Sequence, residues 1–187
     1  HWAFQPVSNP PVPALSGDKH WAKNTIDNFI LAKLVEKKLT PSPKADKVTL
    51  IRRATFDLIG IPPTTKEVDD FEADDSADAF LKVIDRLLAS PHYGERWGRY
   101  WLDLAHYADT KGQVGGNEDN RYLNSWVYRD YVIRSFNEDL PYDQFLLQQI
   151  AADKLPAGED KRSLAALGFL TLGNRFNNQV NDIIDDR

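Results

Sequence analysis

Cysteine and methionine are both absent from the 187 residues. Without cysteine the chain can form no disulfide, offers no thiol nucleophile, and can neither bind zinc through thiolates nor attach haem covalently. The absence of methionine, in a chain that begins at His1, predicts that the sequence is a fragment of a larger protein whose own start lies elsewhere.

Long apolar runs and an excess of positive charge are lacking as well. No segment approaches the run of about 18 apolar residues that a transmembrane helix needs, so we expect no membrane span. The formal net charge is −5, and lysine and arginine are not concentrated in any segment, which argues against nucleic acid as a partner. The remaining composition, with 42% hydrophobic and 27% charged residues, is that of an ordinary globular domain.

Proline is concentrated at the start of the chain, with four prolines in the first thirteen residues. This spacing predicts an extended arm over residues 1–23. Its aromatic residues Trp2, Phe4 and Trp21 are too apolar for a free linker, so we expect the arm to pack along the domain with those rings buried. Residues 24–187 are then predicted to form a single helical domain.

Helix-capping residues recur after the arm, and glycine and proline lie between the periodic segments rather than inside them. Helices are expected to begin at or just after Asn24, Asp46, Thr64, Ser76, Ser90, Ser125, Pro141 and Ser163. No alternating pattern typical of strands appears. The sequence therefore predicts an all-α fold, an irregular multi-helix domain of about seven to eight helices with an extended proline-rich N-terminal arm.

The stretch ERWGRYWLDLAHYADTKG, residues 95–112, is the densest in aromatic and charged side chains. It is predicted to continue a helix to about residue 108. At 3.6 residues per turn, one face carries Trp97, Tyr100, Trp101, Leu104 and Ala108. This spacing favours core packing over a cofactor wall.

The charged edge of the same stretch holds the candidate catalytic residues Asp103, His106 and Asp109. An Asp-x-x-His spacing on a helix lets the carboxylate orient the imidazole, so an acid–base or metal-binding cluster is one interpretation. A surface ion pair between Arg99 and Asp103 is the simpler one, and we favour it. A structural role is also favoured for Arg129, which is expected to bridge to a buried carboxylate such as Asp103.

The following loop is rich in oxygen donors that calcium prefers. Candidate metal ligands are Asp109, Asn117, Glu118 and Asp119, with Asn120 beside them. The spacing of an EF-hand is missing, so a solvated loop is the favoured interpretation and calcium the alternative.

Several phrases, spread in unbroken order over nearly the whole chain, resemble one known family. They are HWAFQPV, NTIDNFILAKL, LIRRATFDLIGIPPT, LLASPHYGERWGRYWLDLAHYADT, YRDYVIRSFNEDLPYDQFLLQQIAADKLP and GFLTLG. The chain is similar to the planctomycete-type cytochrome-associated domain of the PSCyt group, second type, a domain of unknown function from large exported proteins.

The resemblance implies an extracytoplasmic location, in the periplasm or cell envelope, and partners among the other domains of the same polypeptide. Members commonly carry a c-type cytochrome module, so c-type haem is expected in adjacent parts of the full protein and no cofactor within this chain. In similar proteins the segment VNDIIDDR leads on to a Cys-x-x-Cys-His stretch, which would lie beyond Arg187. Relatives usually have arginine at the position of His106, which disfavours a mechanism based on histidine.

Three functions follow as hypotheses. The first is a helical module of an exported cytochrome-linked multidomain protein, which positions a c-type haem domain or partner for electron transfer. The second is a carboxylate-based enzyme or binding module acting on cell-envelope glycans, with Asp103 and Asp109 beside aromatic rings that stack on sugars. The third is a scaffold without a redox role. The sequence leaves open whether the chain is an enzyme.

Overall fold

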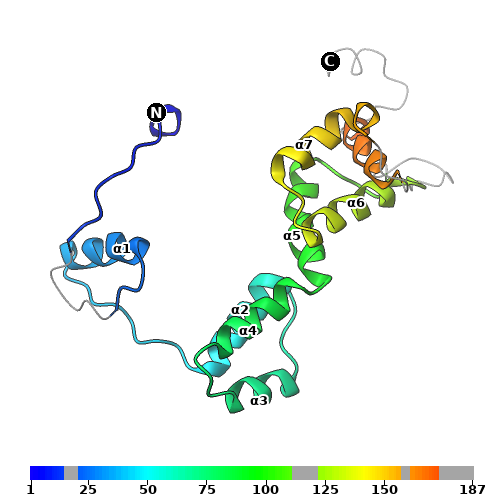
Figure 1. Ribbon diagram of the computed structural model, residues 1–187. Helices are drawn as coiled ribbons and strands as arrows, with labels where there is room; N and C mark the ends of the chain where they lie inside the picture. Colours follow the sequence, from blue (N-terminus) through cyan, green and yellow to red (C-terminus); the bar gives the residue numbers. More distant parts are fainter. Residues whose placement is uncertain (15–20, 111–121, 157–160, 173–187) are drawn as a thin grey trace. The chain divides into compact units, whose positions relative to one another are not determined.

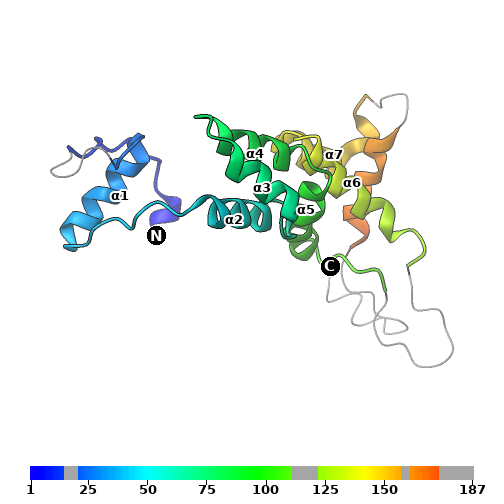
Figure 2. The ribbon, with the colours of Figure 1, turned by 90° about the horizontal axis from the view of Figure 1, so that it is seen from below.

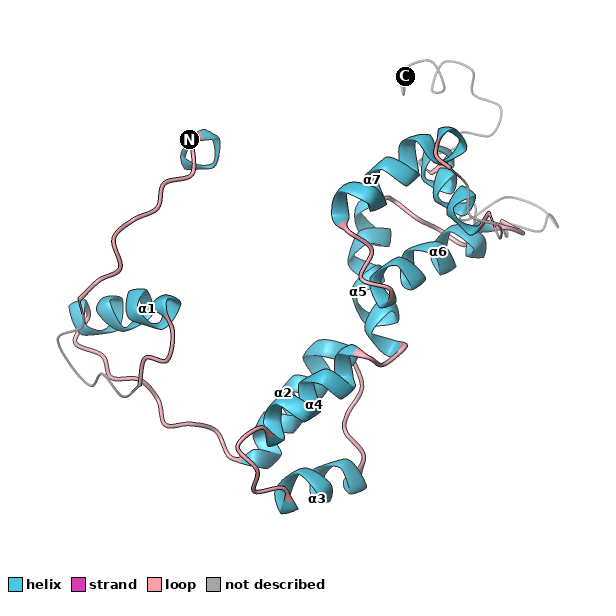
Figure 3. Cartoon of the chain, viewed as in Figure 1, coloured by secondary structure: helices cyan, strands magenta, loops and turns pink. Residues whose placement is uncertain are grey.

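The computed structural model describes residues 1–14, 21–110, 122–156 and 161–172 (Figure 1). Within these ranges the chain forms seven α-helices and three 3-10 helices and contains no strand, which confirms the predicted all-α fold (Figure 3). It divides into two compact units, His1–Ala45 and Asp46–Arg187, which are described separately.

The first unit contains the 3-10 helix η1 (Trp2–Phe4) and the helix α1 (Thr25–Glu36). Asn24 begins α1 as predicted, because its side chain accepts a hydrogen bond from the amide of Asp27 and the Asp27 carboxylate accepts one from the amide of Asn24. Leu31 is buried within this unit, whereas Phe4 is 88% exposed. That residues 1–23 pack against the rest of the chain stays a prediction.

The second unit begins with three helices around one small core, α2 (Lys47–Ile59), α3 (Thr65–Ala73) and α4 (Ala79–Leu88). The predicted caps of the first two are confirmed, since Asp46 accepts from the amide of Thr49 and Thr64 forms a capping box with Glu67. Buried apolar side chains join the three helices, namely Ile51, Phe71, Ala79, Val83 and Leu87.

Ser76 does not cap α4, contrary to prediction. The helix begins three residues later, at Ala79, and the Ser76 hydroxyl donates instead to the carboxylate of Asp74 at 2.5 Å. The Ser76 amide donates to the same carboxylate, and these two bonds, followed by one from Lys82, lower the pKa of Asp74 to about 2. Ser76 therefore closes the turn before α4 rather than starting the helix.

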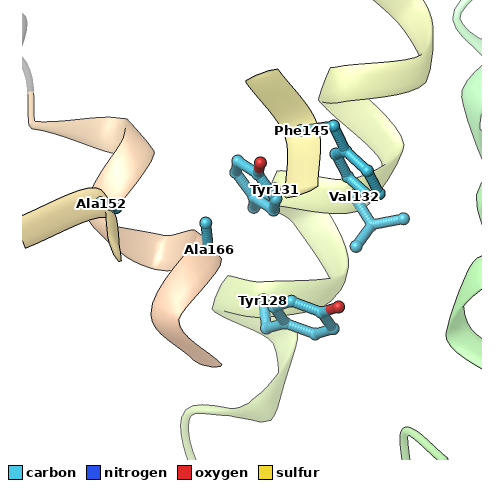
Figure 4. Packing of buried hydrophobic residues seen from close by; sticks show 6 residues of the cluster. All are labelled: Tyr128, Tyr131, Val132, Phe145, Ala152 and Ala166. Atoms are coloured by element: carbon cyan, nitrogen blue, oxygen red, sulfur yellow. The ribbon is translucent and has the colours of Figure 1, made fainter. Parts of the chain in front are cut away.

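A second core lies between α5 (His92–Leu104), α6 (Ser125–Asn137), α7 (Tyr142–Ala151) and the 3-10 helices η2 (Ala152–Lys154) and η3 (Arg162–Thr171) (Figures 1 and 2). Its buried residues are Tyr128, Tyr131, Val132, Phe145, Ala152 and Ala166 (Figure 4). The rings of Tyr131 and Phe145 stack with their planes 1° apart and their centroids 5.8 Å apart. This aromatic core fixes α6 against α7.

The buried face of α5 differs from the predicted aromatic face. Gly94, Gly98 and Ala105 are buried, whereas Tyr100 is 48% and Leu104 75% exposed. The physical reason is the contact with α6, which approaches α5 so closely that only small residues fit between the backbones. Of the predicted face, Trp101 alone packs against the second core.

The sequence places Trp126, Arg129, Ile133 and Phe136 in register on one face of α6, and the structure buries a different set of side chains there. In α6 the buried residues are Tyr128, Tyr131, Val132 and Ser135, whereas Trp126 is half exposed. The segment predicted to begin at Ser163 is a 3-10 helix that begins at Arg162, so Ser163 lies inside it. The predicted irregular tail after residue 173 lies outside the described residues.

Candidate functional site

The predicted catalytic residues Asp103, His106 and Asp109 lie at or just beyond the C-terminus of α5. The helix ends at Leu104, earlier than predicted, because His106 adopts a left-handed conformation with φ of 54°. The amide of Tyr107 donates to the carbonyl of Leu102 at 3.0 Å, and the amide of His106 to that of Asp103 at 3.2 Å. These two bonds form a Schellman motif, in which His106 occupies the position that usually holds glycine.

The three candidates are consequently not arranged on one helix edge. Asp103 lies in the last turn of α5, and its Oδ2 is 3.9 Å from Nε of Arg99, so the predicted ion pair is present at the surface. His106 lies beyond the helix, and the prediction that it shares an edge with Asp103 is wrong. The contacts of Asp109 involve neither of them.

Asp109 instead interacts with side chains that flank it on both sides in sequence. The Tyr107 hydroxyl donates to Asp109 Oδ1 at 2.5 Å, and the Ser125 hydroxyl to the same atom at 3.4 Å. Nη1 of Arg129 lies 3.6 Å from it. Burial, followed by the hydrogen bond to Asp109, raises the pKa of Tyr107. Among the described residues, the carboxylates within ion-pair distance of Arg129 are those of Asp109 and Asp130, so Arg129 bridges to a carboxylate as expected but not to that of Asp103.

The backbone of Asp109 closes the base of the long loop. Its carbonyl accepts from the amide of Tyr122 at 2.8 Å, and the Ser125 hydroxyl donates to the carbonyl of Tyr122 at 3.0 Å. Residues 109 and 122 are thereby held side by side, so this cluster anchors both ends of the segment between them.

The predicted calcium ligands Asn117, Glu118 and Asp119, with Asn120, lie outside the described residues. Elsewhere in the described ranges, no three histidine, aspartate or glutamate side chains come close enough together to hold a metal ion. Calcium binding by the loop stays a prediction.

A buried polar network lies inside the second core and was missed from the sequence. Nε1 of Trp101 donates to the hydroxyl of Tyr128 at 2.9 Å and to Oε1 of Gln149 at 3.0 Å. The Tyr128 hydroxyl donates to the same Gln149 oxygen at 2.6 Å. Burial raises the pKa of Tyr128 to about 12. A signal was available, because Gln149 lies four residues after Phe145 on an otherwise apolar helix face.

One face of α5 carries a row of aromatic rings that is half-buried at Tyr93 and Trp97, exposed at Tyr100, and followed by the exposed Leu104. Ring centroids are 6.2 Å apart between Tyr93 and Trp97 and 5.6 Å apart between Trp97 and Tyr100. The guanidinium of Arg96 lies 5.3 Å from the centroid of Tyr100, and Leu104 follows one turn later. We refer to Tyr93, Trp97, Tyr100 and Leu104 as the α5 stripe.

A cavity of about 260 Å³ lies between α6, α7 and η3. Tyr131, Arg134 and Ser135 of α6 and its C-cap Glu138 contribute to the lining, together with residues of the two other elements. The cavity could not be predicted from the sequence, because its lining residues come from several separate segments and form no local sequence motif.

Together these features define an all-α domain with an aromatic core, a buried polar network and an exposed tyrosine and leucine, Tyr100 and Leu104, on one face of α5. No helix in the described ranges is both long and apolar enough to span a membrane. The chain belongs to the PSCyt2 family, described as a protein of unknown function (DUF1549), which residues 25–186 match. The resemblance noted in the sequence is thus confirmed. No curated protein and no solved structure matches the chain.

Proposed function

We propose that the chain is a helical module of an exported, cytochrome-linked multidomain protein, and that it positions a c-type haem domain for electron transfer. The exposed end of the α5 stripe, Tyr100 and Leu104, is the docking face in this proposal. The resemblance to domains of exported proteins that carry a cytochrome module supports both the partner and the extracytoplasmic location.

The observation that carries the proposal is the exposure of Tyr100 and Leu104 on a rigidly held helix. Tyr100 is 48% and Leu104 75% exposed, and both lie on one face of α5. Another face of α5, at Gly94 and Gly98, is packed closely against α6. Exposed large apolar side chains that gather on one face mark interaction sites. Because α5 is already held in place by its packing on α6, little conformational entropy would be lost when this face binds a partner.

The glycan-directed alternative gains no comparable support. Glycosidases need a pair of carboxyl groups that face one sugar ring across about 5 to 9.5 Å. Here Asp103 contacts Arg99, whereas Asp109 contacts Tyr107, Ser125 and Arg129. The two carboxylates therefore serve separate local structures.

The test uses the full-length polypeptide and its Soret band. The haem would be reduced, and its reoxidation by a soluble one-electron acceptor followed for the wild type and for Leu104→Ser. Burying a leucine is worth about 1.5 to 3 kcal/mol, so the variant is expected to weaken docking roughly tenfold or more and to slow the haem reaction. Leu81→Ser is the matched control, because Leu81 is a 59% exposed leucine on α4.

Two results would overturn the proposal. A full-length protein without a Soret band has no haem domain to position. Equal reoxidation rates for Leu104→Ser, Leu81→Ser and the wild type would show that the α5 stripe takes no part in the reaction.

A further inference from the structure

The cavity between α6, α7 and η3 has a buried floor and charged walls. Tyr131 and Ser135 form part of the lining and are only 2% and 5% exposed. Arg134, in the last turn of α6, and Glu138, its C-cap, line the same cavity. It shares no lining residue with the α5 stripe, so it is a separate feature of the domain.

Arg134 and Glu138 are one helical turn apart but do not pair. No carboxylate in the described ranges lies within ion-pair distance of Arg134, whose Nη2 donates only to the carbonyl of Arg162, at 3.4 Å. An arginine that precedes a glutamate by four residues is the less favourable order for a pair within a helix. Glu138 is also the C-cap of α6, where the helix dipole disfavours a negative charge. A cation brought in from outside would therefore stabilise Glu138.

The lining also offers two hydrogen-bond donors besides Arg134, from Gln148 and Ser163. Oε1 of Gln148 accepts from the Tyr131 hydroxyl at 3.2 Å, which leaves the amide nitrogen of Gln148 for a ligand. The hydroxyl of Ser163 makes no hydrogen bond with any described residue. A guanidinium, an amide and a hydroxyl together suit a carboxylate.

We propose that this cavity binds a small zwitterion, an α-amino acid, whose carboxylate is held by Arg134 and whose ammonium group is held by Glu138. Side chains four residues apart on a helix have their Cβ atoms about 6 Å apart, so both charges can reach one ligand of this size. A cavity of about 260 Å³ is smaller than a typical drug-sized site, which agrees with a ligand of a few atoms.

The test measures binding to the chain by calorimetry and by ligand-observed NMR. The probes are glycine, L-alanine and L-glutamate, with propionate and ethylamine as analogues of alanine that lack the amino group or the carboxylate. We expect saturable binding of the amino acids and at least tenfold weaker binding of both analogues. Arg134→Gln is expected to weaken alanine at least tenfold, and Glu138→Gln to abolish the preference for alanine over propionate.

Arg99→Gln is the matched control, because Arg99 is an exposed arginine on α5 and should leave binding unchanged. Thermal unfolding of each variant shows whether it folds, and Glu138→Gln removes an unfavourable charge, so its fold is expected to persist. The proposal is overturned if none of the three amino acids binds, if propionate binds as well as alanine, or if both cavity variants bind like the wild type. These measurements involve no haem and stand apart from the docking test.

Discussion

Gly94 of α5 and Ile133 of α6 are packed so closely that a Cβ on Gly94 would lie 2.2 Å from the carbonyl oxygen of Ile133. The side chain of Asn137 completes the contact, since it accepts from the Gly94 amide at 2.7 Å and donates to the carbonyl of Pro91 at 3.0 Å. One turn later, a Cβ on Gly98 would meet the nearest atom, of Val132, at 3.4 Å. The close packing of α5 on α6, where the two helices cross, therefore requires glycine at position 94 and depends much less on glycine at position 98.

Gly94→Ala is expected to destabilise the domain by at least about 1 to 3 kcal/mol, because the added methyl group forces two backbones apart and displaces Asn137. Gly98→Ala is the matched control in the same helix. It is expected to be neutral or to stabilise by up to about 1 kcal/mol, since it restricts the unfolded chain and meets only an ordinary contact. Urea unfolding of both variants checks this, and equal losses would contradict it.

The same crossing explains why the buried face of α5 could not be predicted. Helical periodicity is read from large apolar side chains, so Trp97, Tyr100 and Leu104 predicted which face of the helix packs in the core. The contact is instead made where side chains are smallest, at Gly94 and Gly98, and this depends on a partner helix more than 30 residues away.

Local signals were reliable by comparison. The caps at Asn24, Asp46 and Thr64 follow from hydrogen bonds within four residues. Ser76 failed because a neighbouring carboxylate, Asp74, competes for its hydroxyl.

The candidate site required contacts that no local pattern contains. Asp109 was identified from the sequence, but its partner Arg129 lies 20 residues away and was assigned to Asp103 instead. The cavity is lined by three elements, so its composition could be seen only after folding.

His106→Gly is expected to stabilise the domain by about 1 kcal/mol, because glycine adopts the left-handed conformation of this Schellman position without steric cost. His106→Ala removes the imidazole but keeps the Cβ, so no gain is expected from it. Thermal unfolding of the two variants distinguishes them. A glycine variant that is less stable than the wild type would show that the imidazole itself supports the structure.

Gln149→Leu is expected to destabilise the domain by about 1 to 3 kcal/mol, because it leaves the buried hydroxyl of Tyr128 without its acceptor. Tyr128→Phe removes that hydroxyl. This change leaves Gln149 as the acceptor for Nε1 of Trp101, so no donor of the network is left unpaired and the loss should be smaller than for Gln149→Leu. Urea unfolding of the two variants measures both losses, and a loss for Tyr128→Phe as large as that for Gln149→Leu would contradict the network.

Stability is expected to fall as the pH rises from about 10 to 12, in part because of Tyr128. Burial raises its pKa from 10.0 to about 12 in the folded protein. Between these values the unfolded chain loses the phenolic proton while the folded protein keeps it, so the unfolded state binds fewer protons and each step up in pH favours unfolding. The contribution is thus fully present below pH 10 and lost as the pH passes the folded pKa. Tyr107 and Tyr131 shift in the same direction.

The share due to Tyr128 is isolated by comparing urea midpoints of the wild type and Tyr128→Phe at pH 9, 10, 11 and 12. The variant is expected to be less stable at pH 9 but to lose less stability between pH 10 and 12, because it has one fewer buried phenol to ionise. Tyrosinate absorbance, recorded at each pH for the folded proteins, should show one fewer late-titrating phenol in the variant. Parallel pH profiles for the two proteins would contradict the raised pKa of Tyr128.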